Sequence, residues 1–276
     1  MLEIIKAVVY GVIQGFFAWL PVSSVAHVKI IPVLLGWEDP GPAYSAVLQM
    51  GTMVAVLIYF YHDLKKIGLS VIDAIKHKNF KTNHDARLFV YIILGTIPII
   101  IFGVLFQKQI KAEFRGMYVM AAGLIVFGIL LYISERYSKL SRTVEEITLK
   151  DTIIIGLMQV LALIPGCSRS GSTITAGFFR NLNRESAARF SFLLGLPAFF
   201  LAGMFELFKE KDSLMGPNAH TMSLIVGTLV SAVVGYLSVW FLLSYVRKHS
   251  LMIFVVYRIA LGVIIIVLVS MNIISN

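Results

Sequence analysis

Cysteine and charge are both scarce in this chain of 276 residues. Because Cys167 is the only cysteine, no disulfide can form within the chain. Charged residues make up 14% of the sequence and hydrophobic ones 58%, whereas soluble domains average about a quarter charged residues. This composition excludes an ordinary water-soluble protein. The apolar stretch 7–21 lacks a small-residue cleavage pattern near its end, so we expect it to be retained rather than removed as a signal peptide.

Acidic residues are fewer than basic ones, 15 against 24, which gives a formal net charge of +9. Such a charge raises the possibility of a nucleic-acid partner, but the basic residues lie between apolar stretches. If segment 63–87 is cytoplasmic and the stretches alternate outward from it, most basic residues face the cytoplasm, as the positive-inside rule requires. The other side then carries Glu38, Asp39 and the mixed run 209–212. The charge therefore indicates membrane topology, and we expect no nucleic-acid partner.

Long apolar stretches are the most abundant feature of the sequence. A helix that spans a bilayer needs ~20 predominantly apolar residues, and six stretches meet this requirement. They cover about 44–62, 88–106, 117–134, 190–208, 222–245 and 252–273. The sequence therefore predicts an all-α polytopic membrane protein with six transmembrane helices in a single membrane domain, 1–276.

The sequence also contains two similar halves, 1–136 and 150–276, whose matching segments keep their order. The matches are Gly11-Val-Ile-Gln14 with Gly156-Leu-Met-Gln159, Pro21-Val-Ser23-Ser24 with Pro165-Gly-Cys-Ser168, Gly95-Thr96 with Gly227-Thr228, and Tyr118 to Gly123 with Tyr257 to Gly262. Each half reads as a broken apolar segment followed by three full spans.

The broken segments run from about 4 to 36 and from 152 to 180, and each has two short apolar arms around a proline-containing turn. We expect them to be re-entrant helix hairpins, which makes the halves inverted-topology repeats with three crossings each. Ordinary kinked spans are the alternative. Interrupted helices that meet at the middle of the membrane form binding sites for charged groups, because their N-termini present unpaired N–H groups.

The second turn carries an arginine, Arg169, between apolar sequences. An arginine at that depth costs at least ~2.5 kcal/mol, which makes it a candidate functional residue. Its neighbours supply hydroxyl groups and a backbone that a ligand can approach closely, namely Ser168, Ser170, Gly171, Ser172 and Thr173. A guanidinium among such groups favours an anion, above all phosphate. The alternative is a structural arginine that binds helix carbonyls.

The first turn holds Ser23, Ser24 and His27. Ser24 and His27 are three residues apart, so on a helix they share a face and could hydrogen-bond as a nucleophile and its base. The alternative is that one serine caps the helix while His27 packs in an interface. In the arm before each turn, Gln14 and Gln159 either bind a backbone carbonyl or line the site.

Three motifs resemble those of the bacterial undecaprenyl-diphosphate phosphatases of the bacitracin-resistance type. They are Leu20-Pro-Val-Ser-Ser-Val-Ala-His27, Gln49-Met-Gly-Thr-Met-Val-Ala-Val56 and Pro165-Gly-Cys-Ser-Arg-Ser-Gly-Ser-Thr173. The likeness extends over essentially the whole chain. It implies hydrolysis of undecaprenyl diphosphate to the monophosphate carrier lipid of cell-wall synthesis, at a site that opens to the outer face of the cytoplasmic membrane. It also implies six spans, two re-entrant hairpins and often a homodimer.

The resemblance gives Ser24 the role of nucleophile, His27 that of the neighbouring histidine and Arg169 that of the phosphate clamp. It assigns the binding pocket to Ser23, Ser168, Ser170 and Thr173, with the Gly171 backbone beside them. The family also has a motif of Glu or Gln followed four residues later by Glu. Gln14 fits the first position, but the second is Ala18.

This departure concerns the divalent cation, Mg or Ca, that the family implies. A carboxylate at position 18 could bind the cation or relay a proton near Gln14, and alanine can do neither. Losing a general acid or base costs about 10²- to 10⁴-fold in rate. We therefore expect the chain to bind polyprenyl diphosphate but to turn it over poorly. The alternative function is a polyprenyl-phosphate transporter or flippase, which needs the anion site but no nucleophile. A structural scaffold would leave the buried arginine unexplained.

Overall fold

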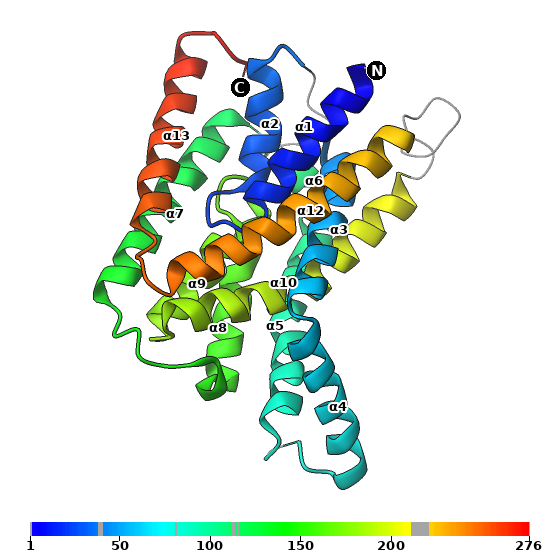
Figure 1. Cartoon of the computed structure of the whole chain (residues 1–276). Coiled ribbons are helices and arrows are strands. Elements are labelled where there is room, and N and C mark those ends of the chain that lie inside the picture. Colours follow the sequence, from blue (N-terminus) through cyan, green and yellow to red (C-terminus); the bar gives the residue numbers. More distant parts are fainter. Residues whose placement is uncertain are drawn as a thin grey trace.

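The computed structural model describes residues 2–37, 41–80, 82–111, 114, 116–210 and 221–275. Within these ranges all elements are helical apart from one isolated β-bridge between Arg142 and Leu182. The helices form an elongated bundle with both chain ends at one end and α4 (Tyr61–His77) at the other (Figure 1). The outer-side charges Glu38 and Asp39, with residues 211 and 212 of the mixed run, lie outside the described ranges.

Five of the described helices are long and apolar enough to cross a membrane. They are α5 (His84–Leu105), α7 (Met117–Tyr137), α10 (Arg184–Lys209), α12 (Thr221–Val246) and α13 (Met252–Ser270). The expected span 44–62 folds as α3 (Gly41–Tyr59), which ends three residues early because the chain bends by 76° into α4. Counted as one broken span, α3 and α4 make a sixth crossing element.

Both segments predicted to be broken fold as pairs of short helices. The first consists of α1 (Leu2–Phe17) and α2 (Ser24–Leu34). The second consists of α8 (Leu149–Val160), a 3₁₀ turn η3 (Leu161–Leu163) and α9 (Arg169–Phe179). In each pair the two helices pack against one another. The turns therefore lie where the sequence puts Pro21 and Pro165, away from the ends of the bundle.

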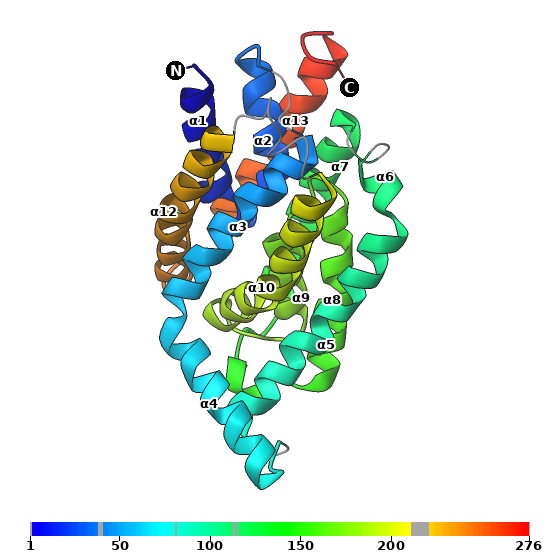
Figure 2. The ribbon, with the colours of Figure 1, turned by 90° about the vertical axis from the view of Figure 1, so that its right-hand side faces the viewer.

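The long helices pack around these pairs. Helix α12 packs against α1 and α3, whereas α5 packs against α8 and α10, and α7 lies beside α13. The turned view shows α5 and the short α6 (Gln107–Lys111) along the side of the bundle near α8 and α10 (Figure 2). Glycine permits the close approach of these helices. A Cβ atom on Gly11 would lie 2.5 Å from the Gly227 oxygen, and one on Gly156 would lie 2.5 Å from the Gly95 oxygen.

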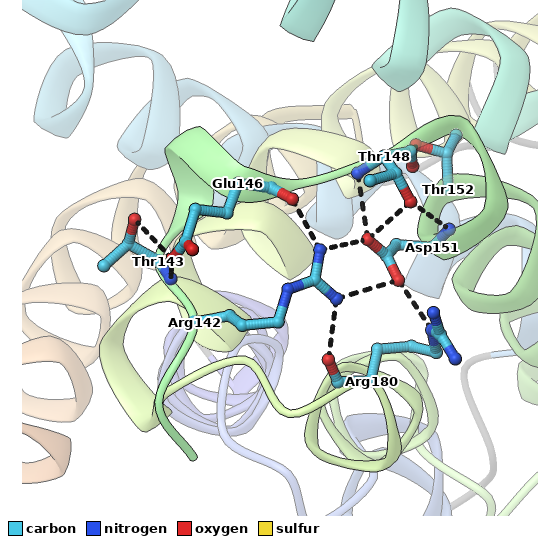
Figure 3. Close-up of polar contacts among 7 residues, drawn as sticks. All are labelled: Arg142, Thr143, Glu146, Thr148, Asp151, Thr152 and Arg180. Atoms are coloured by element: carbon cyan, nitrogen blue, oxygen red, sulfur yellow. Dashed lines mark hydrogen bonds and ion pairs between the residues drawn. The ribbon is translucent and has the colours of Figure 1, made fainter. Parts of the chain in front are cut away.

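A charged cluster closes the end of the α8–α9 pair that is farther from its turn (Figure 3). The buried Asp151 carboxylate accepts hydrogen bonds from Arg142 Nη2 and Arg180 Nε, each at 2.6 Å, and from the Thr148 backbone N at 2.9 Å. Arg142 also donates to the Glu146 and Arg180 carbonyl oxygens. These contacts join the start of α8 to the end of α9 and to the loop that contains η2 (Val144–Glu146).

The two arginines determine the charge state of Asp151. Burial alone would raise the pKa of this carboxyl group, but the hydrogen bonds from Arg142 and Arg180 outweigh burial and hold the pKa well below its usual range. A carboxylate with a depressed folded-state pKa contributes stability above its unfolded pKa of ~3.9, and that contribution is lost as the pH falls toward the folded value.

We predict that Asp151→Asn lowers the free energy of unfolding by about 2 kcal/mol, because two partly buried arginines lose their counter-charge. This figure is below that for fully buried pairs because both arginine side chains are about a quarter exposed, at 23% and 29%. Thermal unfolding in detergent measures the change. The difference from the unmodified chain should shrink below about pH 4. Equal melting temperatures at pH 7 would contradict the role of Asp151, and the matched control is Asp73→Asn, at an exposed carboxylate of α4.

Candidate active site

A cavity of about 620 Å³ lies where the two turns meet α5, α6 and α10. One part of its wall is polar and comes from the turns, with Ser23, Ser24, Ser168 and Arg169. The rest is largely apolar and comes from the later halves of α5 and α10 and from α6. That part includes Ile99, Ile100, Gly103, Val104, Ile110, Phe199, Leu201 and Phe205. The cavity thus suits a ligand with a polar head and a hydrocarbon body.

Arg169 is the charged group at the polar wall. Its Nη1 donates to the Ser191 carbonyl oxygen at 2.5 Å, whereas Nε and Nη2 are buried and have no hydrogen-bond partner. The guanidinium carbon lies 4.7 Å from the centre of the Trp19 ring and 4.5 Å from that of Phe199. The described residues offer it no carboxylate partner. A buried cation with two unused donors needs an anion, so the geometry favours the functional interpretation of Arg169 over the structural one.

The second turn owes its shape to its own serines and threonine. Ser168 has a positive φ of 68°, and its Oγ caps α9 by accepting a hydrogen bond from Gly171 N at 3.1 Å. Ser170 Oγ donates to the Leu20 oxygen of the first turn at 2.9 Å. Thr173 Oγ1 lies 2.7 Å from Ser191 Oγ. Of these three predicted binding residues only Ser168 lines the cavity. Ser170 binds a backbone carbonyl and Thr173 a neighbouring hydroxyl.

The first turn departs from the predicted nucleophile–base pair. Ser23, with φ of 69°, and Ser24 line the cavity, but the side chain of Ser23 makes no capping hydrogen bond. No hydrogen bond joins Ser24 to His27 among the described contacts. Instead His27 Nδ1 lies 2.7 Å from the Ser23 oxygen and Nε2 lies 2.7 Å from the Tyr257 hydroxyl. The prediction of a direct pair was wrong, because the ring reaches back one helical turn to a backbone carbonyl and does not line the cavity.

Phe17 explains why the His27 ring stays in this position. Its ring stacks on the imidazole with the ring centres 3.7 Å apart, and the Tyr257 ring lies nearly parallel beside the imidazole, with its centre 5.6 Å from that of His27 and 6.4 Å from that of Phe17. One ring face and both nitrogens of His27 are thus engaged. The interface interpretation of this histidine fits the contacts better than that of a free base.

The residues expected near the cation separate in the structure. Ala18 lines the cavity, whereas Gln14 is buried in α1 away from the lining. Gln159 binds a backbone carbonyl, with Nε2 3.5 Å from the Gly95 oxygen, so of its two predicted roles the structural one is confirmed. Glu206 supplies the only carboxylate among the described lining residues, and no described group of three or more His, Cys, Asp or Glu side chains could hold a metal ion. The described residues at the cavity do not fit a divalent cation held by the protein alone.

Arg258 is a site residue that sequence reasoning missed. It is fully buried in α13, and within the described part of the chain its guanidinium donates to backbone carbonyls alone. The acceptors are the oxygens of Pro21 at 3.1 Å, Gly166 at 3.1 Å, Cys167 at 2.9 Å, Leu124 at 3.3 Å and Gly123 at 3.3 Å. The signal was present, because Arg258 lies inside the apolar stretch 252–273, where an arginine always demands an explanation.

Comparison with known proteins gives a consistent result. The family model described as bacitracin resistance protein BacA matches residues 7–264. A protein of Chloroherpeton thalassium is 46% identical, one of Prosthecochloris aestuarii 45% and one of Chlorobium phaeovibrioides 47%, each over 98% of both chains. All three are named undecaprenyl-diphosphatase. With its paired turns, its buried arginines and these matches along nearly its whole length, the chain belongs to the BacA family of bacitracin resistance proteins.

Proposed function

We propose that this chain is a membrane phosphohydrolase that converts undecaprenyl diphosphate to undecaprenyl phosphate and inorganic phosphate. The single observation that carries the proposal is Arg169, with two unpaired guanidinium nitrogens at the polar wall of a largely apolar cavity. A diphosphate supplies the counter-charge for Arg169, and a polyprenyl chain matches the walls from α5 and α10. The names of the relatives state the same activity for those proteins.

In this proposal Ser24 is the nucleophile and Arg169 stabilises the transition state. Ser24 Oγ forms a bond to the terminal phosphorus while the bond from that phosphorus to the bridging oxygen breaks, and the lipid monophosphate leaves. The guanidinium of Arg169 neutralises charge on the equatorial oxygens. The Ser24 proton passes to a phosphate oxygen, because His27 is not hydrogen-bonded to Ser24. Water then hydrolyses the phosphoserine, which releases inorganic phosphate and restores the hydroxyl.

We infer that the halves 1–136 and 150–276 are inverted repeats and that the pairs α1–α2 and α8–α9 are re-entrant hairpins. Three observations support this. Ser23 and Ser168 share a positive φ, at 69° and 68°. Matching glycines make matching contacts, Gly11 with Gly227 and Gly156 with Gly95. Helix α12 packs on α1 as α5 packs on α8.

The basic residues assign the faces. They gather toward the α4 end, which the positive-inside rule puts in the cytoplasm. The cavity lies in the halves of α5 and α10 that are farther from α4, so it opens to the outer face of the cytoplasmic membrane in this proposal. The homodimer implied by the resemblance stays a prediction.

The transporter alternative requires access to Arg169 from both faces. Buried apolar side chains pack in one cluster that extends from the first turn along α3 and α12 to the bend between α3 and α4. They include Trp19, Met53, Val56, Phe60, Val239, Leu242 and Leu243. A transport cycle would have to separate this cluster, whereas hydrolysis needs only the existing cavity. This difference favours the phosphatase.

We predict that Arg169→Lys lowers kcat/KM for undecaprenyl diphosphate by about 10²-fold or more, because one ammonium cannot replace the two free donors and the contact with Ser191. Release of inorganic phosphate in detergent measures the effect. The matched control is Arg189→Lys in α10, where the arginine pairs with Asp63 outside the cavity. An Arg169→Lys variant as fast as this control would refute the phosphate clamp.

Ser24→Ala should abolish phosphate release while the chain still binds the lipid diphosphate, since only the attacking oxygen is lost. Ser23→Ala, at the neighbouring cavity hydroxyl, should retain measurable turnover. Trapping of a phosphoserine from labelled substrate provides the second readout. Persistent hydrolysis by Ser24→Ala would remove Ser24 from the mechanism.

We predict that Ala18→Glu raises turnover by about 10²-fold and makes it depend on an added divalent cation, because a carboxylate then lines the cavity at the first turn, in addition to Glu206. The glutamine of Ala18→Gln has nearly the same size as glutamate but no charge, so this variant should show neither the higher turnover nor the dependence on a cation. The measurement is phosphate release with magnesium or calcium and with a chelator. If both variants behave like the unmodified chain, the missing carboxylate does not limit this protein.

A further inference from the structure

Arg258 connects the two turns through its separate guanidinium nitrogens. Nη1 donates to the Pro21 oxygen in the first turn, and Nη2 donates to the Gly166 and Cys167 oxygens in the second. Carbonyls in turns have lost their helical N–H partners, and a buried carbonyl without a partner is costly. One buried cation therefore satisfies carbonyls of both turns, and these carbonyls take the place of a counter-ion.

The planar fork of arginine is necessary for this arrangement. Its donors point in fixed, divergent directions, whereas a lysine has one nitrogen on a flexible stem. Gly166 allows the second turn to lie close to α7, because a Cβ atom at this position would collide with the Met120 backbone. Its φ of 94° also disfavours residues other than glycine. Arg258 of α13 thus fixes the position of the second turn relative to the first together with the direct hydrogen bond from Ser170 Oγ to the Leu20 oxygen.

Tyr257, the preceding residue, holds the first turn by a second route. A carbonyl oxygen can only accept, so His27 Nδ1 must carry the proton that it donates to the Ser23 oxygen. In the neutral ring Nε2 is then the acceptor, and the Tyr257 hydroxyl donates to it at 2.7 Å. A chain of two hydrogen bonds thus runs from α13 to the backbone of Ser23, directly before Ser24.

We propose that Tyr257 and Arg258 are positioning residues that hold the two turns so that Ser24 and Arg169 border one cavity. His27 is the link in this device and not the base that activates Ser24. The proposal rests on the proposed function for its kinetic readout, but the geometry of the turn can also be measured without turnover. No residue of this pair lines the cavity.

The kinetic experiment compares Tyr257→Phe, His27→Asn and His27→Leu in phosphate release from undecaprenyl diphosphate. An asparagine amide can still donate to the Ser23 oxygen, as Nδ1 does, but it cannot act as a base. Positioning predicts that His27→Leu loses about 10²-fold in kcat and that His27→Asn recovers most of this loss, with KM changed by less than about twofold. Tyr257→Phe should lower kcat by about tenfold, and its KM should also change by less than about twofold. If His27→Asn is as slow as His27→Leu, the proposal is overturned and His27 is a base.

The matched control is Tyr118→Phe. Tyr118 occupies the corresponding place in the first half, on α7, and its hydroxyl lies 3.5 Å from Ser270 Oγ at an exposed position. This substitution should leave kcat unchanged. An equal loss in Tyr118→Phe and Tyr257→Phe would show a general effect of removing a tyrosine hydroxyl and would overturn the proposal.

A second measurement separates failure of this proposal from failure of the proposed function. In a Cys167→Ser background, Ser24→Cys is labelled with a small methanethiosulfonate reagent, and the rate is compared with and without Tyr257→Phe and Arg258→Lys. Positioning predicts that each added substitution changes the labelling rate by about tenfold, because the turn moves relative to the cavity. Unchanged rates would overturn the proposal whether or not the chain hydrolyses lipid. If the labelling rates change but the unmodified protein releases no phosphate, the positioning role is supported and only the proposed phosphatase function is rejected.

Discussion

The interior of the fold depends on a guanidinium whose charge is met by backbone carbonyls, with no carboxylate partner among the described residues. Arg258 is completely buried, and five backbone carbonyls surround its charge. Breaking a buried charged contact costs several kcal/mol, so segments from both halves of the chain must stay where these acceptors can be reached. The turns at Pro21 and Pro165, the close approach at Gly166 and the pairing of α7 with α13 all meet around this one side chain.

Arg169 is also a buried guanidinium, but unlike Arg258 it keeps unpaired donors. Its guanidinium is also buried, but one nitrogen is satisfied by Ser191 while two have no partner. Trp19 and Phe199 cover it without neutralising it. One arginine is therefore saturated by the protein, and the other keeps capacity for an anion. This contrast explains why a cavity between two fixed turns suits the binding of a lipid diphosphate in the proposed function.

Apolar runs and turn residues made the helices and both broken segments predictable, because the bilayer requires long apolar helices and proline interrupts them. Arg169 was predictable as a functional residue because an arginine between apolar sequences is costly in a membrane. The direction in which each side chain points was harder to predict from the sequence. Ser170 and Thr173 bind Leu20 and Ser191 instead of lining the cavity, and His27 turns to a carbonyl that competes with Ser24. Arg258 stands out in its apolar span, but its role was not predictable because its acceptor carbonyls come from three segments distant in the sequence.

The most direct test of the account is a structure of Ser24→Ala with undecaprenyl diphosphate bound. The account predicts that the terminal phosphate lies within hydrogen-bond distance of Arg169 Nε and Nη2, with the first isoprene units between α5 and α10 and with Arg258 still bound to both turns. A diphosphate bound elsewhere on the protein, with the two nitrogens of Arg169 still unpaired, would contradict it.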